Sequence, residues 1–360
     1  MTNRKWGFET LVNTTVTGSQ IDPVVTVLAD GGYVIAWWDL GPILDAIRFQ
    51  IFDPDGERRG PESTLQPLQD RQNQEPSIAA LDDGGFVIVY ESDPTDSDSD
   101  PRFQRFDADG ILEDAGTISS SVDEQFRPTV SPLGSGFVAI WDNDTDSDIQ
   151  ARIIDAAGNP ASGTFTVNTT LTGNQTDPDV VELTGGNFVV VWEDNEGTDA
   201  VRARLFDSSG TPIGNDFFIA STSTNFTNPK VTALTNGGFV VTYTDASTTF
   251  PENSFGFKAR IYGPDGSPFG SEFIVASDLA GDEYSPDVTA LPNGGFFVAW
   301  VDLSGDESIR GQAFDVLGNR VGGETIINTS DVNDPGIDGV AVAALPDGRV
   351  VVTWPNNNSA

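Results

Sequence analysis

The sequence predicts an all-β fold, a seven-bladed β-propeller built from four-stranded repeats of about fifty residues. Three observations predict it: a short apolar run closed by an aromatic residue recurs seven times, tight turns join the runs to preceding strands, and no stretch shows helical periodicity. The runs begin at residues 33, 86, 137, 188, 239, 296 and 350. Successive starts are 51 to 57 residues apart, and a unit of that length is small for the alternative, a tandem array of independent sandwiches.

Each repeat is predicted to contain four short strands, A to D. Strand A, as in residues 178–183, leads into strand B through Asp-Gly or Asn-Gly, the dipeptides that best accept the positive φ of a hairpin turn. Strand B is the aromatic-ended run, and it is apolar on both faces, as a strand packed between two neighbouring sheets should be. Strand C, as in 201–206, is followed by Asp with Gly three residues later, the pattern of a type I turn. Strand D is short, as in 217–219.

The repeats indicate one domain over residues 1–360, in which the N-terminal strand closes the ring. Residues 3–14 match 319–329, so the chain opens with an isolated strand D, and we expect residues 8–12 to complete the last blade. That last blade has no recognisable strand C. The A–B hairpins are predicted near residues 22–38, 77–91, 129–142, 179–193, 230–244, 287–301 and 340–354.

The composition excludes several kinds of chemistry and of partner. The chain has 55 acidic and 18 basic residues, a formal charge of −37, and neither Cys nor His. Ser-His-Asp triads, cysteine nucleophiles and Cys/His zinc sites therefore lack their residues. The charge repels nucleic acid and anionic lipid, and no apolar run is long enough to insert into a membrane. We expect a monomer without a cleavable signal peptide, because no apolar segment follows Arg4 and Lys5.

The repeat units resemble those of a known group of proteins. Residues 165–178, followed by Gly-Gly-Asn-Phe-Val-Val-Val-Trp192 and Arg204-Leu-Phe-Asp207, are similar to repeats in large bacterial secreted proteins of the calcium-associated RTX type and in adhesin-like proteins. The resemblance implies an extracellular or cell-surface location, reached without an N-terminal signal; a cytosolic location is the alternative. The glycine-rich nonapeptide array of those proteins is absent from this sequence.

One face of the predicted disc is the better candidate for binding. The A–B and C–D turns share one face and are short, whereas the B–C and D–A loops share the other and vary in length, as binding loops on a rigid scaffold do. Phe250, Phe255 and Tyr284 fall in these loops and are candidate ligand contacts. The aromatic residues that end strand B, in contrast, should pack between blades.

The same loops carry alternating aspartates that could bind Ca²⁺, which takes six to eight oxygen ligands. The candidate ligands occupy two segments: Asp142, Asp144, Asp146 and Asp148 in one, and Asp93, Asp96, Asp98 and Asp100 in the other. A solvated acidic surface is the alternative interpretation.

These features predict a secreted or cell-surface binding module that recognises a glycan or a surface protein and is stabilised by Ca²⁺. The alternative is a carboxylate-dependent glycoside hydrolase or polysaccharide lyase, since such enzymes need neither His nor Cys. A buried pair of carboxylates in a funnel at the ring axis would favour the enzyme, and exposed aromatics in separate loops without such a pair would favour the binding module.

The calcium hypothesis makes a direct prediction. Four carboxylates within residues 142–148 repel one another, so bound Ca²⁺ should raise the melting temperature more than NaCl of equal ionic strength, and a chelator should reverse the effect. Asp144→Ala should weaken the response. Equal shifts with CaCl₂ and NaCl in scanning calorimetry would contradict a calcium site.

Overall fold

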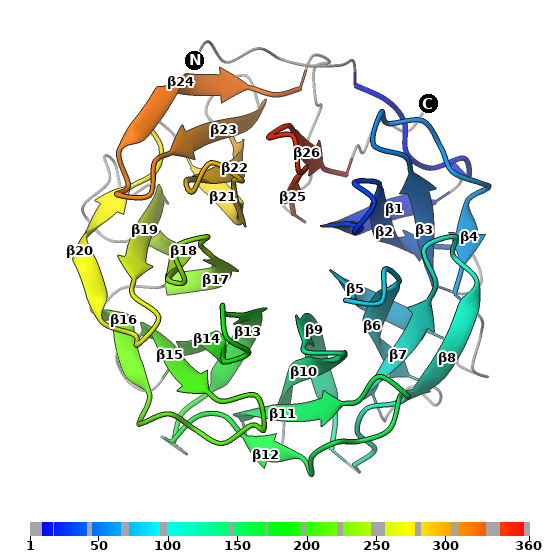
Figure 1. The fold of residues 1–360 in the computed structure, drawn as a ribbon, viewed down its shortest axis with the longest axis horizontal. Coiled ribbons are helices and arrows are strands. Elements are labelled where there is room, and N and C mark those ends of the chain that lie inside the picture. Colours follow the sequence, from blue (N-terminus) through cyan, green and yellow to red (C-terminus); the bar gives the residue numbers. More distant parts are fainter. Residues whose placement is uncertain are drawn as a thin grey trace.

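The computed structural model describes residues 9–16, 18–41, 45–65, 72–93, 99–121, 123–143, 147–169, 172–195, 199–221, 226–245, 256–277, 282–303, 308–328 and 339–355. These residues form only β-strands and loops, arranged as a β-propeller of six four-stranded sheets (blades one to six, in chain order) and one two-stranded sheet around a common axis (Figure 1). Within this part of the chain there is no helix that could cross a membrane.

The strands of every sheet follow one another from the axis to the rim (Figure 1). The innermost strands (A) are β1 (Ser19–Val27), β5 (Gln72–Ala80), β9 (Gln125–Leu133), β13 (Gln175–Glu182), β17 (Phe226–Ala233), β21 (Glu283–Ala290) and β25 (Ala341–Ala344). The second strands (B) are β2 (Tyr33–Leu40), β6 (Phe86–Asp93), β10 (Gly136–Asn143), β14 (Phe188–Asp194), β18 (Phe239–Asp245), β22 (Phe296–Asp302) and β26 (Val350–Thr353). The third strands (C) are β3 (Ala46–Phe52), β7 (Asp100–Phe106), β11 (Asp148–Ile154), β15 (Ala200–Phe206), β19 (Gly256–Tyr262) and β23 (Ser308–Phe314). The rim strands (D) are β4 (Ser63–Thr64), β8 (Leu112–Thr117), β12 (Phe165–Thr166), β16 (Phe217–Ser221), β20 (Pro268–Ile274) and β24 (Arg320–Ile326).

The second strand of each blade is the core of the ring. All eight residues of β10 are buried, because one face of the strand packs on the preceding blade and the other on the following blade. The first aromatic of strand B stacks on the last aromatic of strand C, as Phe188 does on Phe206 with ring centroids 5.1 Å apart. The aromatic that ends strand B is buried between blades, as Trp192 is. The predicted packing role of these aromatics is therefore confirmed.

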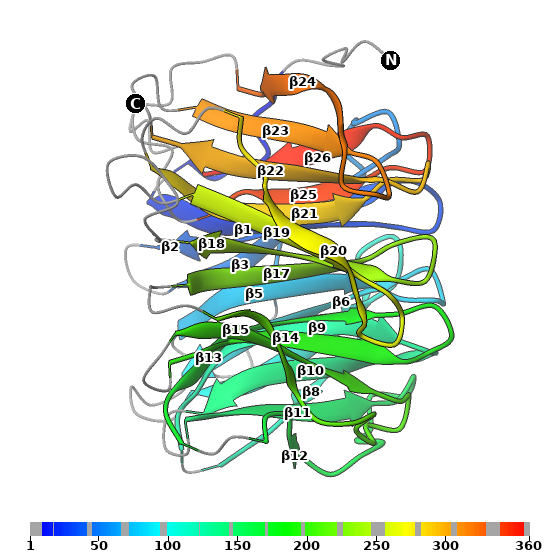
Figure 2. The same cartoon turned by 90° about the vertical axis from the view of Figure 1, so that its left-hand side faces the viewer.

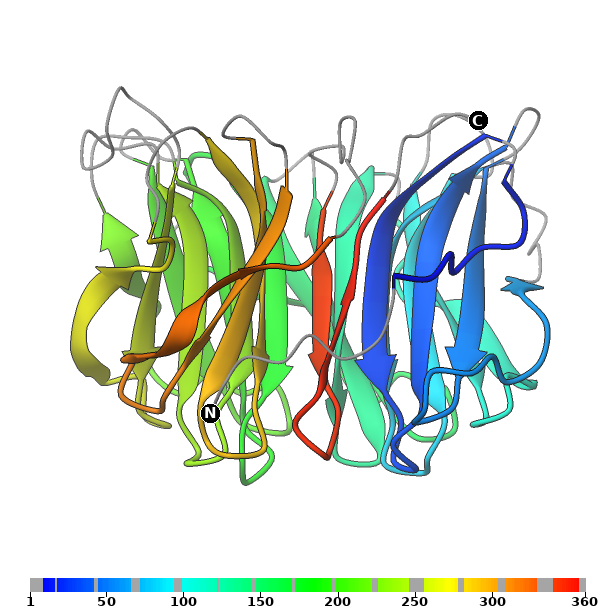
Figure 3. The same cartoon turned by 90° about the horizontal axis from the view of Figure 1, so that it is seen from above.

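The tight turns occupy one face of the ring, at the lower edge in Figure 3. The Asp that follows strand C holds its turn: Asp107 accepts the backbone N–H groups of Asp109 and Ile111, and the same arrangement recurs at Asp155, Asp207 and Asp315. Many acidic residues thus serve the fold rather than a ligand.

Other acidic residues pair with the cations of strand C inside one blade. Arg202 of β15 makes ion pairs with Asp194 on strand B and, at 3.4 Å, with Asp216 beside strand D. Arg48, Lys258 and Arg310 make equivalent pairs in blades one, five and six. The strands run from one face of the ring to the other (Figure 2), and hydrogen bonds and ion pairs join neighbouring strands within each blade.

The predicted seven complete blades and the predicted closure are not found in the described residues. The sheet between blade six and blade one contains only β25 and β26, and residues 9–12 form no strand; residue 8 lies outside the described part. The N-terminal segment instead contacts blade one. Glu62 accepts hydrogen bonds from both the N–H and the hydroxyl of Thr14, and Arg58 donates to the Leu11 and Val12 carbonyls.

Candidate functional site

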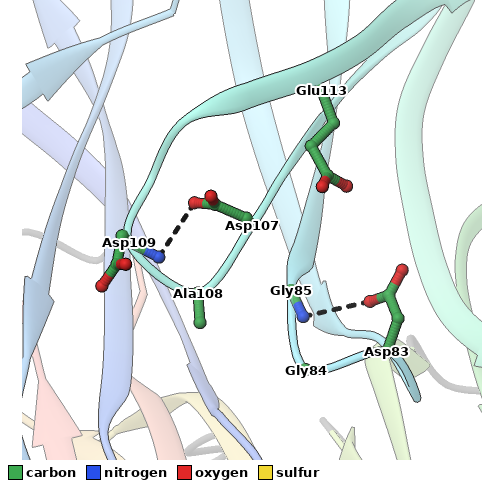
Figure 4. A pocket seen from close by; sticks show the side chains of 7 residues that line it. All are labelled: Asp83, Gly84, Gly85, Asp107, Ala108, Asp109 and Glu113. Carbon is green, nitrogen blue, oxygen red and sulfur yellow. Dashed lines mark hydrogen bonds between the residues drawn. The ribbon is translucent and has the colours of Figure 1, made fainter.

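A hollow of about 290 Å³ opens on the tight-turn face. It is lined by the turn residues Asp83, Gly84, Gly85, Asp107, Ala108, Asp109 and Glu113 (Figure 4). Two of its carboxylates are already used by the backbone, since Asp83 accepts the Gly85 N–H and Asp107 accepts the Asp109 N–H. The hollow is therefore a product of the turns rather than a reactive site.

At the opposite face the innermost strands of blades one to six carry the same backbone irregularity. A β-bulge lies beside an X-Pro pair, and the residue before the proline has a φ near +50°. Six residues occupy this position: Asp22, Glu75, Arg127, Asp177, Asn228 and Ser285. Non-glycine residues with this backbone conformation are strained and concentrate at functional sites.

A second repeated position lies beside the first. It is the residue that directly follows the strand B aromatic, and it lies opposite the bulge of strand A. In blade two, for example, Glu91 pairs with Gln74 at the bulge. Around the ring this position is held by Trp38, Glu91, Asp142, Glu193, Thr244, Val301 and Pro355. Only blades two, three and four have ionisable side chains at both positions. Blades two, three and four thus share a set of charged residues at these two positions, which we call the acidic arc: Glu75, Glu91, Arg127, Asp142, Asp177 and Glu193.

Arg127 connects the three blades of the acidic arc. Its backbone N–H donates to Glu75 of blade two at 3.0 Å. Its guanidinium donates to Asp142 of its own blade and forms an ion pair with Asp177 of blade four, with Nε and Oδ1 3.2 Å apart. One guanidinium therefore separates two carboxyls from different blades. The Arg127 and Asp177 side chains are 40% and 31% exposed, so this pair meets solvent.

Glu91 and Asp142 of the acidic arc are buried, and both hold their protons more tightly than ordinary carboxyls do. Burial, with Asp177 nearby and despite Arg127, raises the pKa of Asp142 to about 7. Burial and the charges of Glu75 and Asp142 raise the pKa of Glu91 to about 7 as well. Among the described residues, Glu91 Oε2 and Asp142 Oδ1 have no hydrogen-bond partner, which is consistent with carboxyls that are partly protonated at neutral pH.

Glu193 and Asp177 form a hydrogen-bonded pair of carboxyls. Burial and the charge of Asp177 raise the pKa of Glu193 to about 8. Glu193 is only 7% exposed, whereas Asp177 reaches solvent. When two carboxyls share a site, one keeps its proton and donates it to the other. The raised pKa keeps Glu193 protonated at neutral pH, so its carboxyl can donate a hydrogen bond to Asp177.

Only some of the predicted metal ligands lie in the described part of the chain. Asp144 and Asp146, like Asp96 and Asp98, lie outside the described residues. Asp142 contacts Arg127, and Asp148 accepts a hydrogen bond from the Asn168 amide at 2.7 Å. Asp93 ends β6 and Asp100 begins β7. Among described residues no three acidic side chains are grouped to hold a metal ion, and calcium binding by the two loops stays a prediction.

The predicted aromatic contacts are also placed in part. Phe250 and Phe255 lie outside the described residues. Tyr284 is half-buried in β21, where its ring packs against the cluster between blade six and the two-stranded sheet and its hydroxyl donates to Asp282 at 3.2 Å.

Sequence reasoning singled out Asp142 as a metal ligand and missed the rest of the acidic arc. The signal was present in the repeats themselves: three consecutive units have an acid directly after the strand B aromatic, where the other units have Trp38, Thr244, Val301 and Pro355. Comparing what differs between aligned repeats, rather than what recurs, would have found it.

No protein-family model and no curated protein matches this sequence. Solved structures do resemble the fold. The intramolecular trans-sialidase of Ruminococcus gnavus has a TM-score of 0.57 at 9% identity, covering 87% of this chain and 99% of its own. An α-L-arabinofuranosidase of Fusarium graminearum has a TM-score of 0.57 at 10% identity, with coverage of 83% and 93%. An ulvan lyase of a polysaccharide lyase family has a TM-score of 0.57 at 8% identity, with coverage of 94% and 92%.

These identities show a shared propeller fold alone. The three similar proteins are glycan-acting enzymes by name, however, and the expectation of a non-enzymatic binding module is contradicted by them. The buried carboxyls near the axis agree with that correction. The physical reason for the error is that paired acids are uninformative in a sequence with 55 of them, and burial distinguishes the few that hold protons.

The raised pKa values predict how stability depends on pH. A carboxyl whose pKa is higher in the folded state stabilises the protein below its unfolded value, near 4, and loses that contribution as pH rises through about 8 for Glu193. Each such group lowers the unfolding free energy by up to about 1.4 kcal/mol per pH unit in that window. Glu193→Gln should therefore flatten the decline of the melting temperature between pH 5 and pH 9.

Asp302→Asn is the matched control, because Asp302 is buried in blade six and paired with Arg310. General repulsion in a chain of charge −37 also weakens the fold at high pH, and it affects both variants equally. A Glu193→Gln profile parallel to that of wild type would contradict the raised pKa.

Proposed function

We propose that this protein is a carboxylate-dependent glycoside hydrolase whose active site is the acidic arc. The observation that carries the proposal is the contrast within this arc: buried carboxyls with pKa values of about 7 to 8 lie beside the solvent-exposed Asp177. Glycoside hydrolysis needs one carboxyl that gives a proton and a second that is ionised. The glycan-acting enzymes with the same fold add support.

The roles follow from burial and contacts. Asp142 is the proposed general acid, which donates its proton to the glycosidic oxygen as that oxygen leaves the anomeric carbon. Asp177 either activates the water that attacks the anomeric carbon or attacks that carbon itself. The first route inverts and the second retains the anomeric configuration, so the stereochemistry of the product distinguishes them. Glu193 keeps its proton and orients Asp177 by donating a hydrogen bond.

The charges of the site favour a neutral glycan. A polysaccharide lyase abstracts a proton next to a uronate carboxylate, and the substrate charge must be neutralised. Arg127 is the one cation of the acidic arc, and it is already engaged by Asp142 and Asp177. Together with a formal charge of −37, this arrangement repels polyanionic substrates.

A panel of polysaccharides tests the proposal. We expect new reducing ends from at least one neutral polymer, and no unsaturated uronate absorbance from anionic polymers. Asp177→Asn and Asp142→Asn should each lower kcat by about 10²- to 10⁴-fold, the typical contribution of a general acid or base. Asp302→Asn, a buried carboxyl paired with Arg310 outside the arc, should leave kcat within twofold. Absence of turnover on all polymers, or full activity of Asp177→Asn, would contradict the proposal.

We also propose that the ring has seven blades and that the N-terminal segment closes it. The support is a repeated contact. Glu62 holds Thr14 as Glu324 holds Ser277 at the junction of blades five and six, through the backbone N–H and the hydroxyl. Arg58 binds the carbonyls of Leu11 and Val12 as Arg320 binds those of residues 274–276. Residues 11–14 thus occupy the place of a strand D exit.

Replacing Glu62 and Glu324 in turn distinguishes a contact that closes the ring from one that only stabilises a blade locally. Glu62→Ala should lower the melting temperature by several degrees and speed proteolysis near residues 11–14, because the chain joins these residues to blade one but not to β25 and β26. Glu324→Ala removes the same contacts where the chain is continuous, so the loss should be smaller. Equal losses in calorimetry would argue against a closing role for the N-terminal segment.

A further inference from the structure

Three charged side chains of neighbouring blades come together at the ring axis, below the acidic arc. Asp179, Lys230 and Asp287 hold the same position in β13, β17 and β21, two residues after the bulge residue of each strand. These strands are neighbours around the axis (Figure 1). Because a strand advances about 3.3 Å per residue, the three positions lie deeper along the axis than Asp177, by roughly the width of a sugar ring.

Hydrogen bonds place the two carboxylates on the axis side of the next sheet. Asp179 accepts the backbone N–H of Val231 in β17 at 2.7 Å, and Asp287 accepts that of Val342 in β25 at 2.7 Å. Among the described strands, β17 and β25 each pair with one strand only, on the side away from the axis. The N–H groups that remain for a side chain therefore point towards the axis. Both carboxylates are held there by the following sheet, and both side chains are only half-buried.

Lys230 is close to both carboxylates but is bonded to neither. Despite burial, which lowers the pKa of a lysine, the charges of Asp179 and Asp287 raise the pKa of Lys230, and Asp177 of the acidic arc adds to the effect. Its ammonium nevertheless forms no ion pair and no hydrogen bond with any of the described residues. Lys258 of the same blade, in contrast, pairs with two carboxylates, at 2.6 and 3.0 Å. The three N–H donors of Lys230 are therefore available to a ligand.

The same position in the other sheets gives the axis a polar and an apolar side. Blades two and three have Ser77 and Thr129 there, whereas blade one has Val24 and the two-stranded sheet has Ala341. A sugar ring carries hydroxyl groups around its edge and C–H groups on its faces, so it can contact both sides. An anion, in contrast, would be repelled by the two carboxylates that flank the single lysine.

We infer that Asp179, Lys230 and Asp287 form a binding subsite for the terminal residue of a neutral glycan. The carboxylates accept hydrogen bonds from sugar hydroxyls, and the ammonium donates to them. The inference rests on the proposed function, because it places this sugar directly below the acidic arc. The innermost strands surround the axis (Figure 1), so a glycan reaches this depth only by a chain end. The enzyme should therefore release short products from chain ends rather than cut within a chain.

Binding of free sugars tests the inference without catalysis. A panel of neutral hexoses and pentoses is titrated against wild type, Lys230→Met and Lys258→Met, and binding is followed by ligand-observed NMR. We expect at least one neutral sugar to bind wild type. Its Kd should rise at least about tenfold in Lys230→Met, the loss expected for a hydrogen bond to a charged group. Lys258→Met is the matched control and should leave Kd within twofold, because its ion pairs lie within blade five.

The alternative is a merely structural role, in which Lys230 only offsets the two carboxylates beside it. That role predicts a lower melting temperature for Lys230→Met with an unchanged Kd, and this result would overturn the inference. An equal loss of binding in Lys258→Met would overturn it too, as would binding of no neutral sugar or tighter binding of sugar acids. If Lys230→Met does not fold, Lys230→Gln, which keeps a polar group between the carboxylates, carries the same comparison.

Turnover separates the subsite from the proposed function. On a neutral polymer that wild type cleaves, short products should accumulate while the viscosity falls little, and Lys230→Met should raise KM. A rapid fall in viscosity would overturn binding by a chain end while the catalytic role of the acidic arc stands. If sugars bind to wild type but no polymer is cleaved, the proposed function fails and the subsite stands.

Discussion

Burial of the second strand between neighbouring blades is the constraint on which the structure depends. A strand such as β10, buried along its whole length, contributes apolar surface to two inter-blade interfaces, and each buried apolar side chain is worth about 1.5 to 3 kcal/mol. Because each blade is covered only by its neighbours, the ring is stable as a unit and every repeat must keep the same spacing. Variation is therefore confined to the residues that follow strand B and precede strand A.

The acidic arc lies at these variable positions. The six non-glycine residues that precede a proline at positive φ cost about 1 to 3 kcal/mol each, and the packed strands beside them supply the compensating stability. The bulge places the residue before proline beside the residue that follows the strand B aromatic. In blades five and six the two positions hold Asn228 with Thr244 and Ser285 with Val301; in blade four they hold Asp177 with Glu193. The same backbone thus gives an uncharged pair or a proton-sharing pair, depending on two side chains.

The sequence allowed the strand order, the hairpin turns and the packing of the strand B aromatics to be predicted, because these depend on local turn chemistry and on periodicity. Strand pairs such as Phe188 with Phe206 recur in register with the sequence repeat. Closure could not be predicted in the same way: residues 9–12 resemble a strand D, but a strand needs a partner, and the described part of the last sheet ends at β26. The acidic arc could not be predicted from composition, since Asp107 and Asp177 are the same residue type and only their surroundings separate a turn-holding carboxylate from one beside a buried acid.

The buried acids also change how the charge of the protein should be understood. The formal value of −37 counts every carboxyl as ionised, yet Glu91, Asp142 and Glu193 have pKa values of about 7 to 8. A field generated by the many other acidic residues makes each further ionisation harder. It therefore helps to keep these three carboxyls protonated at neutral pH. Burial is the largest cause of these raised pKa values, and the negative field of the surface, which also repels polyanions, adds to it.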